Sequence, residues 1–362
     1  MDISQRAMPT FCRHNRFIER CPICSKTLPG NAPASSGSTR AKPSTPQRSS
    51  GERASRRRTG KHAEHVRVRH EARAVDDGYR CGLVAGLRAS ADAYRLAEAI
   101  AFSSGRLLAL GARPPGMYGE ARALAAEDLE RATWICFLLA YLCPVDGDDP
   151  FAGIRLALAE LPDPFALPVH APPGEVASLR EIPLGPRTSH DPQRGADTLL
   201  AYRDWVERAP ATSAAASPTH RAGMQAIAFT GDPAWSPERR FERVFERLAL
   251  PGFTRVGRYE LLVLLARLGL YELRPDALHL AGGRGIAGED ATTLAAKRVF
   301  GIGDPLLLER RATALAQAAS VPVETLDLAL ANWASPQPAA LGFAPETGDA
   351  DAFQRAGDAL EL

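Results

Sequence analysis

The chain of 362 residues has the composition of an ordinary soluble protein, and its length allows two domains or one large domain with appendages. Hydrophobic residues make up 45% and charged residues 24%, and no run approaches the ~20 apolar residues that a membrane helix needs. The first twenty residues carry charges throughout and no apolar stretch, so we predict no membrane span, no secretory signal and a cytoplasmic protein.

The net charge of +2 conceals a basic segment near the N-terminus. Residues 26–60 contain eight lysines and arginines against a single acid, Glu52. A localised basic arm favours a polyanionic partner, most simply nucleic acid, although a solvated linker would have the same composition. Residues 29–65 are rich in Ser, Pro, Gly, Ala and Arg without apolar periodicity, and we expect a disordered linker there.

Three of the six cysteines lie ahead of this linker, in residues 1–28. Cys21 and Cys24 are separated by two residues, one of them a proline, a spacing that lets both thiolates bind one zinc ion from a tight turn. Cys12 and His14 alternate in an extended segment and can supply the other two ligands, which predicts a closed structural zinc site. Reduced cysteines without metal are the alternative. Competing ligands are Cys81, His62, His65 and His70.

Residues 66–195 form the N-terminal helical part of the predicted folded domain. Apolar residues at helical spacing predict helices over residues 89–110 and 118–142, the second of which ends at Pro144. Residues 161–195 are rich in proline and predict a long loop.

Several side chains allow both a structural and a functional interpretation. Trp134, Phe137 and Tyr141 recur at helical spacing and are interpreted as core, as are Cys136 and Cys143 on the same helix. Candidates for base contacts are Gln225, Trp205 and Trp235. Candidates for a metal pair are Asp76 with Asp77 and Asp148 with Asp149. For the four aspartates, ordinary loop acids are the favoured interpretation.

Residues 196–340 form the second and most informative part. Helices are predicted over residues 198–207, 237–248, 258–268, 306–319 and 323–333. No strand alternation is present, so the predicted fold is mostly α-helical. The last residues, 341–362, are acidic and are expected to be a frayed tail.

Two of these helices are joined by a turn with the sequence Leu-Pro-Gly-Phe-Thr, residues 250–254. Glycine allows a left-handed backbone, and free N–H groups at the start of the second helix can bind a phosphate. This predicts a sequence-independent grip on a DNA backbone, with an ordinary helical hairpin as the alternative. The residues of this predicted contact are Gly252, Phe253, Thr254, Arg255, Val256, Gly257 and Arg258.

Residues 250–253 resemble the hairpin of the helix–hairpin–helix DNA glycosylase superfamily. Residues 289–301 resemble its second block, in which an Asp opens a helix and a Gly follows eleven residues later. Asp290 and Gly301 have this spacing. The run from about residue 198 to 333 resembles a divergent branch named for alpha-glutamyl/putrescinyl thymine pyrophosphorylases. That branch is associated with hypermodified phage bases and includes bacterial antiviral glycosylases. The resemblance implies a glycosylase-like helical fold with Asp290 as the catalytic carboxylate.

The sequence also departs from the superfamily pattern. Residues 270–288 are inserted between the hairpin and Asp290, and Thr254 stands where glycine is usual. Asp290 is followed by Ala-Thr in place of Thr-His. Val256 occupies the position of the nucleophilic lysine of bifunctional members, so a Schiff base is not expected.

A lone carboxylate suits cleavage of an N-glycosidic bond. Positive charge develops on the deoxyribose, and a carboxylate beneath the sugar stabilises it and can orient water. Asp290 is also a natural N-cap of the helix that it opens, and the two roles are compatible. Lys297 and Arg298, two turns later, either touch DNA or offset the helix C-terminus.

These features together predict a monofunctional DNA glycosylase that flips and excises a modified base, most simply from phage DNA in anti-phage defence, and leaves an abasic site. Zinc is expected only as a structural ion, and the chemistry is expected to need no cofactor. The alternatives are a pyrophosphorylase-type transferase acting on modified thymine in DNA and a non-enzymatic DNA-binding adaptor. The modified base, the strandedness of the substrate and the oligomeric state are not fixed by the sequence.

Overall fold

The computed structural model describes residues 74–166, 179, 181–194, 196–209, 224–280 and 290–362. The chain separates into two compact units, Met1–Arg69 and His70–Leu362, and every described residue belongs to the second. The predicted linker therefore lies outside the described residues, and so do the predicted zinc ligands, Cys12, His14, Cys21 and Cys24.

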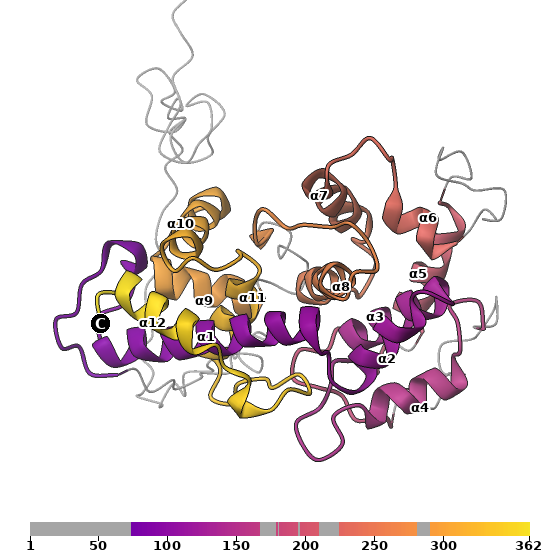
Figure 1. Cartoon of the computed structure of the whole chain (residues 1–362), viewed down its shortest axis with the longest axis horizontal. Coiled ribbons are helices and arrows are strands. Elements are labelled where there is room, and N and C mark those ends of the chain that lie inside the picture. The colour runs from indigo at the N-terminus through magenta and orange to yellow at the C-terminus, as the bar shows by residue number, and fades with distance from the viewer. Residues whose placement is uncertain (1–73, 167–178, 180, 195, 210–223, 281–289) are drawn as a thin grey trace, which may run out of the picture. The chain divides into compact units, whose positions relative to one another are not determined.

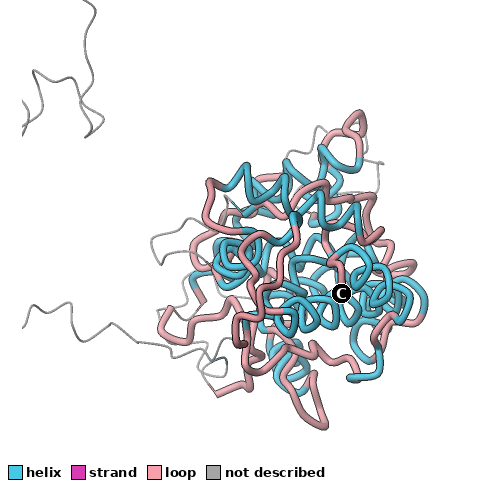
Figure 2. The backbone as a smooth tube through the Cα atoms, turned by 90° about the vertical axis from the view of Figure 1, so that its left-hand side faces the viewer, coloured by secondary structure: helices cyan, strands magenta, loops and turns pink. Residues whose placement is uncertain are grey.

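Within these ranges the second unit is built from helices and loops, without strands (Figure 2). The α-helices are α1 (Ser90–Ala112), α2 (Gly116–Leu124), α3 (Leu129–Leu142), α4 (Ala152–Glu160), α5 (Asp197–Glu207), α6 (Gln225–Thr230), α7 (Pro237–Arg247), α8 (Arg255–Arg267), α9 (Ala291–Phe300), α10 (Pro305–Ala318), α11 (Thr325–Ala334) and α12 (Ala350–Ala359). Two short 3-10 helices, η4 (Gly82–Val84) and η7 (Pro345–Thr347), accompany them. The prediction of a mostly α-helical fold is confirmed for the described residues.

One predicted helix is two. Residues 118–142 divide into α2 and α3, because Asp128 starts a new helix by accepting a hydrogen bond from Arg131 N at 2.9 Å. An aspartate N-cap satisfies a donor that a continuous helix would satisfy through its own backbone. Helix α4 was not predicted from the sequence.

Helix α3 forms the centre of the core. All its residues from Ala132 to Leu142 are buried. The rings of Trp134 and Phe137 stack at 5.1 Å, and that of Phe137 stacks on Tyr202 of α5 at 3.9 Å. The interpretation of Trp134, Phe137 and Tyr141 as core residues is therefore confirmed.

Helix α8 connects two groups of neighbours (Figure 1). It packs along α3, which also contacts α2, α4 and α6, and it contacts α1, which packs against α11 and α12. Helix α9 lies against α10 and α11. A buried ion pair between Arg106 of α1 and Glu260 of α8 links α1 and its neighbours to α8 and α3.

The C-terminal segment is ordered helix, and the expectation of a frayed acidic tail is wrong. Helix α12 packs against α1 and buries Ala352 and Ala356. Its acidic residues lie on the other face, except for Asp349, which caps the helix and accepts a hydrogen bond from Ser104 at 2.8 Å. Small residues at helical spacing carry this packing, a weaker signal than a stripe of leucines. In the described ranges, every helix is too short or too polar to span a lipid bilayer.

Candidate functional site

The turn between α7 and α8 contains the left-handed glycine that the sequence predicted. Gly252 has φ +79°, a conformation that other residues rarely adopt. A Cβ at this position would lie 2.3 Å from Thr198 Oγ, and that hydroxyl donates a hydrogen bond to Pro251 O at 2.8 Å. Both the backbone angle and the space therefore require glycine.

The side chain of Phe253, predicted to contact DNA, faces the core. It is 4% exposed, and its ring lies 5.4 Å from that of Phe137. One turn later, Gly257 lies so close to Phe253 and Ser189 that a Cβ would come within 2.7 Å and 2.2 Å of them. Phe253 thus anchors the hairpin to α3, and the absence of a side chain at Gly257 makes room for it.

Thr254, which stands where the superfamily has glycine, is the N-cap of α8. Its Oγ accepts a hydrogen bond from Gly257 N at 3.1 Å and lies 2.6 Å from Ser189 Oγ. Within the described residues, the N–H groups of Arg255 and Val256 have no backbone acceptor, as is usual in the first turn of a helix. These are the amides that a phosphate at this turn would meet.

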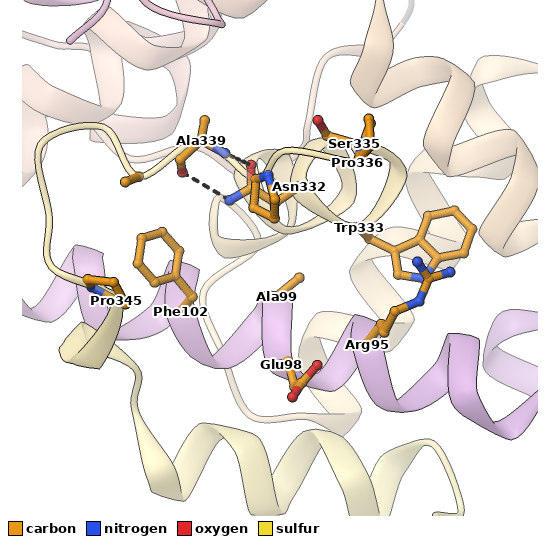
Figure 3. A pocket seen from close by; sticks show the side chains of 12 residues that line it. Arg95, Glu98, Ala99, Phe102, Asn332, Trp333, Ser335, Pro336, Ala339 and Pro345 are labelled. Carbon is orange, nitrogen blue, oxygen red and sulfur yellow. Dashed lines mark hydrogen bonds between the residues drawn. The ribbon is translucent and has the colours of Figure 1, made fainter. Parts of the chain in front are cut away.

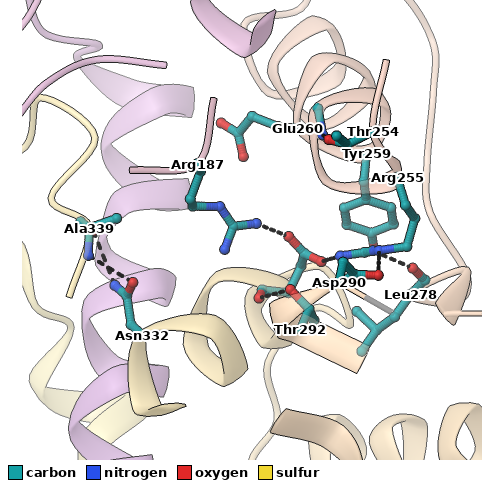
Figure 4. A network of polar contacts seen from close by, with 12 residues as sticks. Arg187, Thr254, Arg255, Tyr259, Glu260, Leu278, Asp290, Thr292, Asn332 and Ala339 are labelled. Atoms are coloured by element: carbon teal, nitrogen blue, oxygen red, sulfur yellow. Dashed lines mark hydrogen bonds and ion pairs between the residues drawn. The ribbon is translucent and has the colours of Figure 1, made fainter. Parts of the chain in front are cut away.

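The side chain of Arg255 is completely buried and points toward α9 and α11 (Figure 4). Nε donates to Asp290 Oδ2 at 3.1 Å, Nη1 to Leu278 O at 2.9 Å and Nη2 to Asp327 Oδ1 at 2.5 Å. Burial alone would lower the pKa of Arg255, but the two carboxylates hold it above its ordinary value. The predicted contact of this guanidinium with DNA would require these bonds to break.

Asp290 is the N-cap of α9, in agreement with its structural interpretation. Oδ1 accepts a hydrogen bond from Thr293 N at 3.1 Å, and Oδ2 accepts one from the Thr293 hydroxyl at 2.8 Å besides that from Arg255. The side chain is 14% exposed. One carboxylate is therefore held in a fixed orientation and still reaches the surface.

Two charged residues of this site were not predicted. Asp327 of α11 is almost completely buried between Arg255 and Arg187, whose Nη2 donates to Asp327 Oδ2 at 2.5 Å. Burial alone would raise the pKa of Asp327, but the two guanidinium groups hold it below its ordinary value. One sequence signal was present, since this aspartate lies between two leucines in a helix whose other residues are mostly apolar. Arg187 lies in the proline-rich loop and had no such signal.

Arg258 also faces inward, although it was predicted to add charge to the phosphate site. It is 7% exposed, its Nη1 donates to Phe245 O at 3.2 Å, and its guanidinium lies 4.4 Å from the centre of the Phe245 ring. Burial and the neighbouring charge of Arg255 lower the pKa of Arg258 to about 10. The side chain fastens α8 to α7.

Lys297 and Arg298 lie in the last turn of α9, as predicted, and both are half-buried. The guanidinium of Arg298 lies 4.9 Å from the centre of the Trp333 ring. At 1.5 Å per residue, Lys297 is about 10 Å along the helix from Asp290. The structure therefore does not bring these two residues together with the Asp290 network, and their contact with DNA stays a prediction.

The other candidate base contacts have structural partners. Gln225 is buried, accepts a hydrogen bond from the Tyr202 hydroxyl at 2.6 Å and donates to Glu130 O at 2.8 Å. Trp205 packs on Phe229 with 5.2 Å between ring centres. The Arg247 guanidinium lies over the ring of Trp235, 5.4 Å from the ring centre.

The remaining acids and cysteines also agree with the structural interpretations. Asp149 pairs with Arg155, and Asp77 accepts a hydrogen bond from Ser90 N at 3.0 Å. In the described part of the chain, no three His, Cys, Asp or Glu side chains are grouped to hold a metal ion. Cys136 and Cys143 are buried, and burial raises the pKa of the Cys143 thiol to about 12, so both are core residues as predicted.

A cavity of about 580 Å³ lies between α1 and the segment after α11 (Figure 3). Phe102 and Trp333 are among its walls, and Arg95 and Glu98 line it from α1. Asn332 holds the opposite segment by donating to Ala339 O at 3.1 Å and accepting from Ala339 N at 2.9 Å. Neither Asp290 nor any hairpin residue lines this cavity, so it is not part of the candidate site.

Comparison with known proteins matches one family over part of the chain. Residues 190–341 match the family described as alpha-glutamyl/putrescinyl thymine pyrophosphorylase clade 3. The predicted resemblance to this branch is therefore confirmed over these residues, which include the hairpin, Arg255, Asp290 and Asp327. No curated protein and no solved structure matches the chain.

Proposed function

We propose that the protein is a monofunctional DNA glycosylase that hydrolyses the N-glycosidic bond of a modified base and leaves an abasic site. The observation that carries this proposal is that the Asp290 carboxylate is both held in place and partly exposed. Its carboxylate caps α9, is 14% exposed, and is held by Arg255 from the first turn after the hairpin. A fixed and accessible carboxylate next to a phosphate-binding turn is what the reaction requires.

The chemistry follows from this arrangement. The N–H groups of Arg255 and Val256 bind a phosphate and fix the strand beside Asp290, and the target base leaves the stack. As the bond between C1′ and the base nitrogen lengthens, positive charge develops on the deoxyribose, and the Asp290 carboxylate stabilises it. Water adds its oxygen to C1′ and loses a proton. The base leaves with the bonding electron pair and takes up a proton, and an abasic site remains.

Val256 determines whether the DNA strand is cut after the base has left. Its side chain is aliphatic and half-buried, and it stands at the position of the superfamily's nucleophilic lysine. Without an amine there, no Schiff base forms with C1′, and the strand is not cut by β-elimination through that residue. The product is an intact strand with one base missing.

The substrate class rests on the family match and on charge. The matched family is named for alpha-glutamyl and putrescinyl thymine, which favours a modified thymine or a related modified base of phage DNA, and hence a role in anti-phage defence. In this proposal the basic residues 29–65 add salt-sensitive affinity for DNA, and Cys12, His14, Cys21 and Cys24 hold a structural zinc ion.

The description of the matched family favours a second candidate, transfer chemistry on a pyrophosphorylated thymine derivative in DNA. Such an enzyme would install or exchange a group on the base and would leave the glycosidic bond intact. The two candidates differ in one product, the abasic site, which only the glycosylase makes.

The test is to incubate the purified full-length protein with phage genomic DNA that carries different modified bases, and with unmodified DNA. Abasic sites are then detected by alkaline cleavage. Asp290→Asn keeps a good N-cap but removes the charge. Its matched control is Asp304→Asn, because Asp304 caps α10 in the same way, accepting from Leu307 N at 2.9 Å, outside the site.

Abasic sites on a modified genome that are lost in Asp290→Asn and retained in Asp304→Asn would support the glycosylase. Intact DNA with altered base composition would move the assignment to transfer chemistry. Binding without any change to the DNA would leave an adaptor role and would overturn the proposed reaction.

A further inference from the structure

We propose that Asp327, with Arg187 as its second counter-ion, is a positioning residue that acts on Asp290 through Arg255. This inference rests on the proposed function and adds to it. It assigns a role in the reaction to Asp327 on α11 and Arg187 in the proline-rich loop, whose side chains are only 4% and 9% exposed.

The first step is the way in which Asp290 is held. Two of its three hydrogen bonds come from Thr293 of its own helix, and these fix the carboxylate relative to α9 only. The third comes from Arg255 Nε at 3.1 Å and is the bond that fixes it relative to α8 and the hairpin. The position of the carboxylate beside a bound strand therefore depends on where this guanidinium lies.

The second step is the way in which Arg255 is held. Its other two nitrogens donate to Leu278 O and to Asp327 Oδ1, at 2.9 Å and 2.5 Å. Both bonds have a charged donor, but only the bond to Asp327 joins opposite charges, so it is the stronger of the two. Asp327 therefore contributes most to the orientation of the guanidinium.

The third step concerns Arg187, whose buried side chain has one ionic partner. Its Nη2 donates to Asp327 Oδ2, while Nε and Nη1 have no hydrogen-bond partner among the described residues. The four charges alternate as Arg187, Asp327, Arg255 and Asp290. Each oxygen of Asp327 is thus occupied by a different guanidinium, which prevents the carboxylate from rotating.

The last step is electrostatic. Asp290 stabilises positive charge on the sugar, and the positive charge of Arg255 next to it opposes that effect. Asp327 lies on the other side of the same guanidinium and offsets part of its charge. Removal of the Asp327 charge would therefore weaken the stabilisation that Asp290 gives and would also loosen Arg255, while the hairpin amides that bind phosphate would be unchanged.

The experiment uses full-length protein under single-turnover conditions, with protein in excess over a DNA that the wild type excises. Asp327→Asn is expected to lower the excision rate constant at least about tenfold while the Kd for DNA stays unchanged. The matched control is Glu260→Gln, which breaks a different buried ion pair of α8, with Arg106, and is expected to leave the rate constant within about twofold of the wild type.

A loss of folding would mimic this result, so a second variant separates the two effects. Asp327→Asn combined with Arg187→Met removes one charge of each sign, and we expect it to regain most of the stability that Asp327→Asn loses. If Asp327 acts on Asp290, the double variant remains slower than the wild type, because the offset to Arg255 is still missing.

A wild-type rate constant in the stable double variant would overturn the inference, since Asp327 would then act only through folding. So would an equal loss in Glu260→Gln, or a loss in Asp327→Asn that is entirely in Kd. The proposed function fails separately, if the wild type excises no base or if Asp290→Asn stays active.

Discussion

The guanidinium of Arg255 lies 3.1 Å from the carboxylate of Asp290, so the residue that begins α8 holds the residue that caps α9. The backbone N–H of Arg255 belongs to the turn proposed to bind phosphate, and its side chain holds the carboxylate of Asp290. Arg255 thus links the hairpin to Asp290, although its guanidinium is completely buried.

Arg255→Met leaves Asp290 and Asp327 without their shared cation. Removal of one partner of a buried ion pair costs about 3–5 kcal/mol, so we expect the free energy of unfolding to fall by about that amount. The control is Arg243→Met, because Arg243 is exposed and pairs with Glu246 at 3.0 Å, and such pairs contribute less than about 1 kcal/mol. Urea denaturation at pH 7 measures both, and equal losses in the two variants would contradict the ion network.

The hairpin and the helix N-cap at Asp290 could be predicted because each depends on a few adjacent residues. The Leu-Pro-Gly sequence fixes a turn with left-handed Gly252, and an Asp before an apolar helical pattern fixes a cap. The extent of the helices α5, α7, α10 and α11 could be predicted for the same reason, since their apolar faces repeat at helical spacing.

The directions of the arginines could not be predicted from the sequence. Arg255 and Arg258 follow a turn that the sequence predicts to bind phosphate, and nothing local distinguishes a guanidinium that faces DNA from one that faces a carboxylate. The carboxylate that turns Arg255 inward, Asp327, lies 72 residues further along the chain. Likewise, the segment that fixes Asp327, around Arg187, precedes the hairpin in a loop without periodicity. Long-range ion pairs leave no local pattern.

Gly252→Ala tests the hairpin, and Gly269→Ala is its matched control. Both glycines have nearly the same φ, +79° and +77°, but a Cβ at Gly269 would meet nothing within 4 Å. We expect Gly269→Ala to lose about 1–2 kcal/mol of unfolding free energy from the backbone alone. Gly252→Ala would lose about 1–3 kcal/mol more, because its methyl group collides with Thr198 Oγ.

The same two variants report on DNA binding. The collision would displace the turn that presents the N–H groups of Arg255 and Val256, so Gly252→Ala is expected to raise the Kd for DNA, and Gly269→Ala is not. Fluorescence anisotropy with a labelled duplex measures this. Equal Kd values in the two variants would show that the hairpin does not contact DNA.

Two histidines, the buried His190 and the partly buried His279, predict how stability depends on pH. His190 lies with Nδ1 2.7 Å from the Tyr141 hydroxyl and Nε2 3.1 Å from Leu179 O, so the neutral ring uses both nitrogens. Burial lowers the pKa of His190, and it also lowers the pKa of His279, which stacks on Phe245 at 4.6 Å. As the pH falls through about 6.5, the unfolded chain binds protons that the folded chain does not bind.

The stabilising contribution of these histidines is therefore complete above pH 6.5 or so and is lost as the pH falls below it. Urea denaturation between pH 8 and pH 5 should show the free energy of unfolding decreasing toward the acidic end. The double variant His190→Gln and His279→Gln should have a shallower slope over this range. An unchanged slope would assign the acid sensitivity to other groups.

The zinc site predicted in residues 1–28 can be tested against Cys81, which was its competing ligand. Cys81 is 6% exposed, and its Sγ donates to Ala359 O at 3.7 Å, so this thiol packs between the start of the described chain and α12. We expect the full-length protein to contain one zinc ion per chain, to lose it in Cys21→Ser and to retain it in Cys81→Ala, as measured by mass spectrometry of the metal. Zinc retained in Cys21→Ser would remove that thiolate from the ligand set, and zinc lost in Cys81→Ala would place Cys81 in it.

Because a module this short would fold around its metal, loss of zinc should also expose residues 1–28 to protease without changing the unfolding of the helical unit.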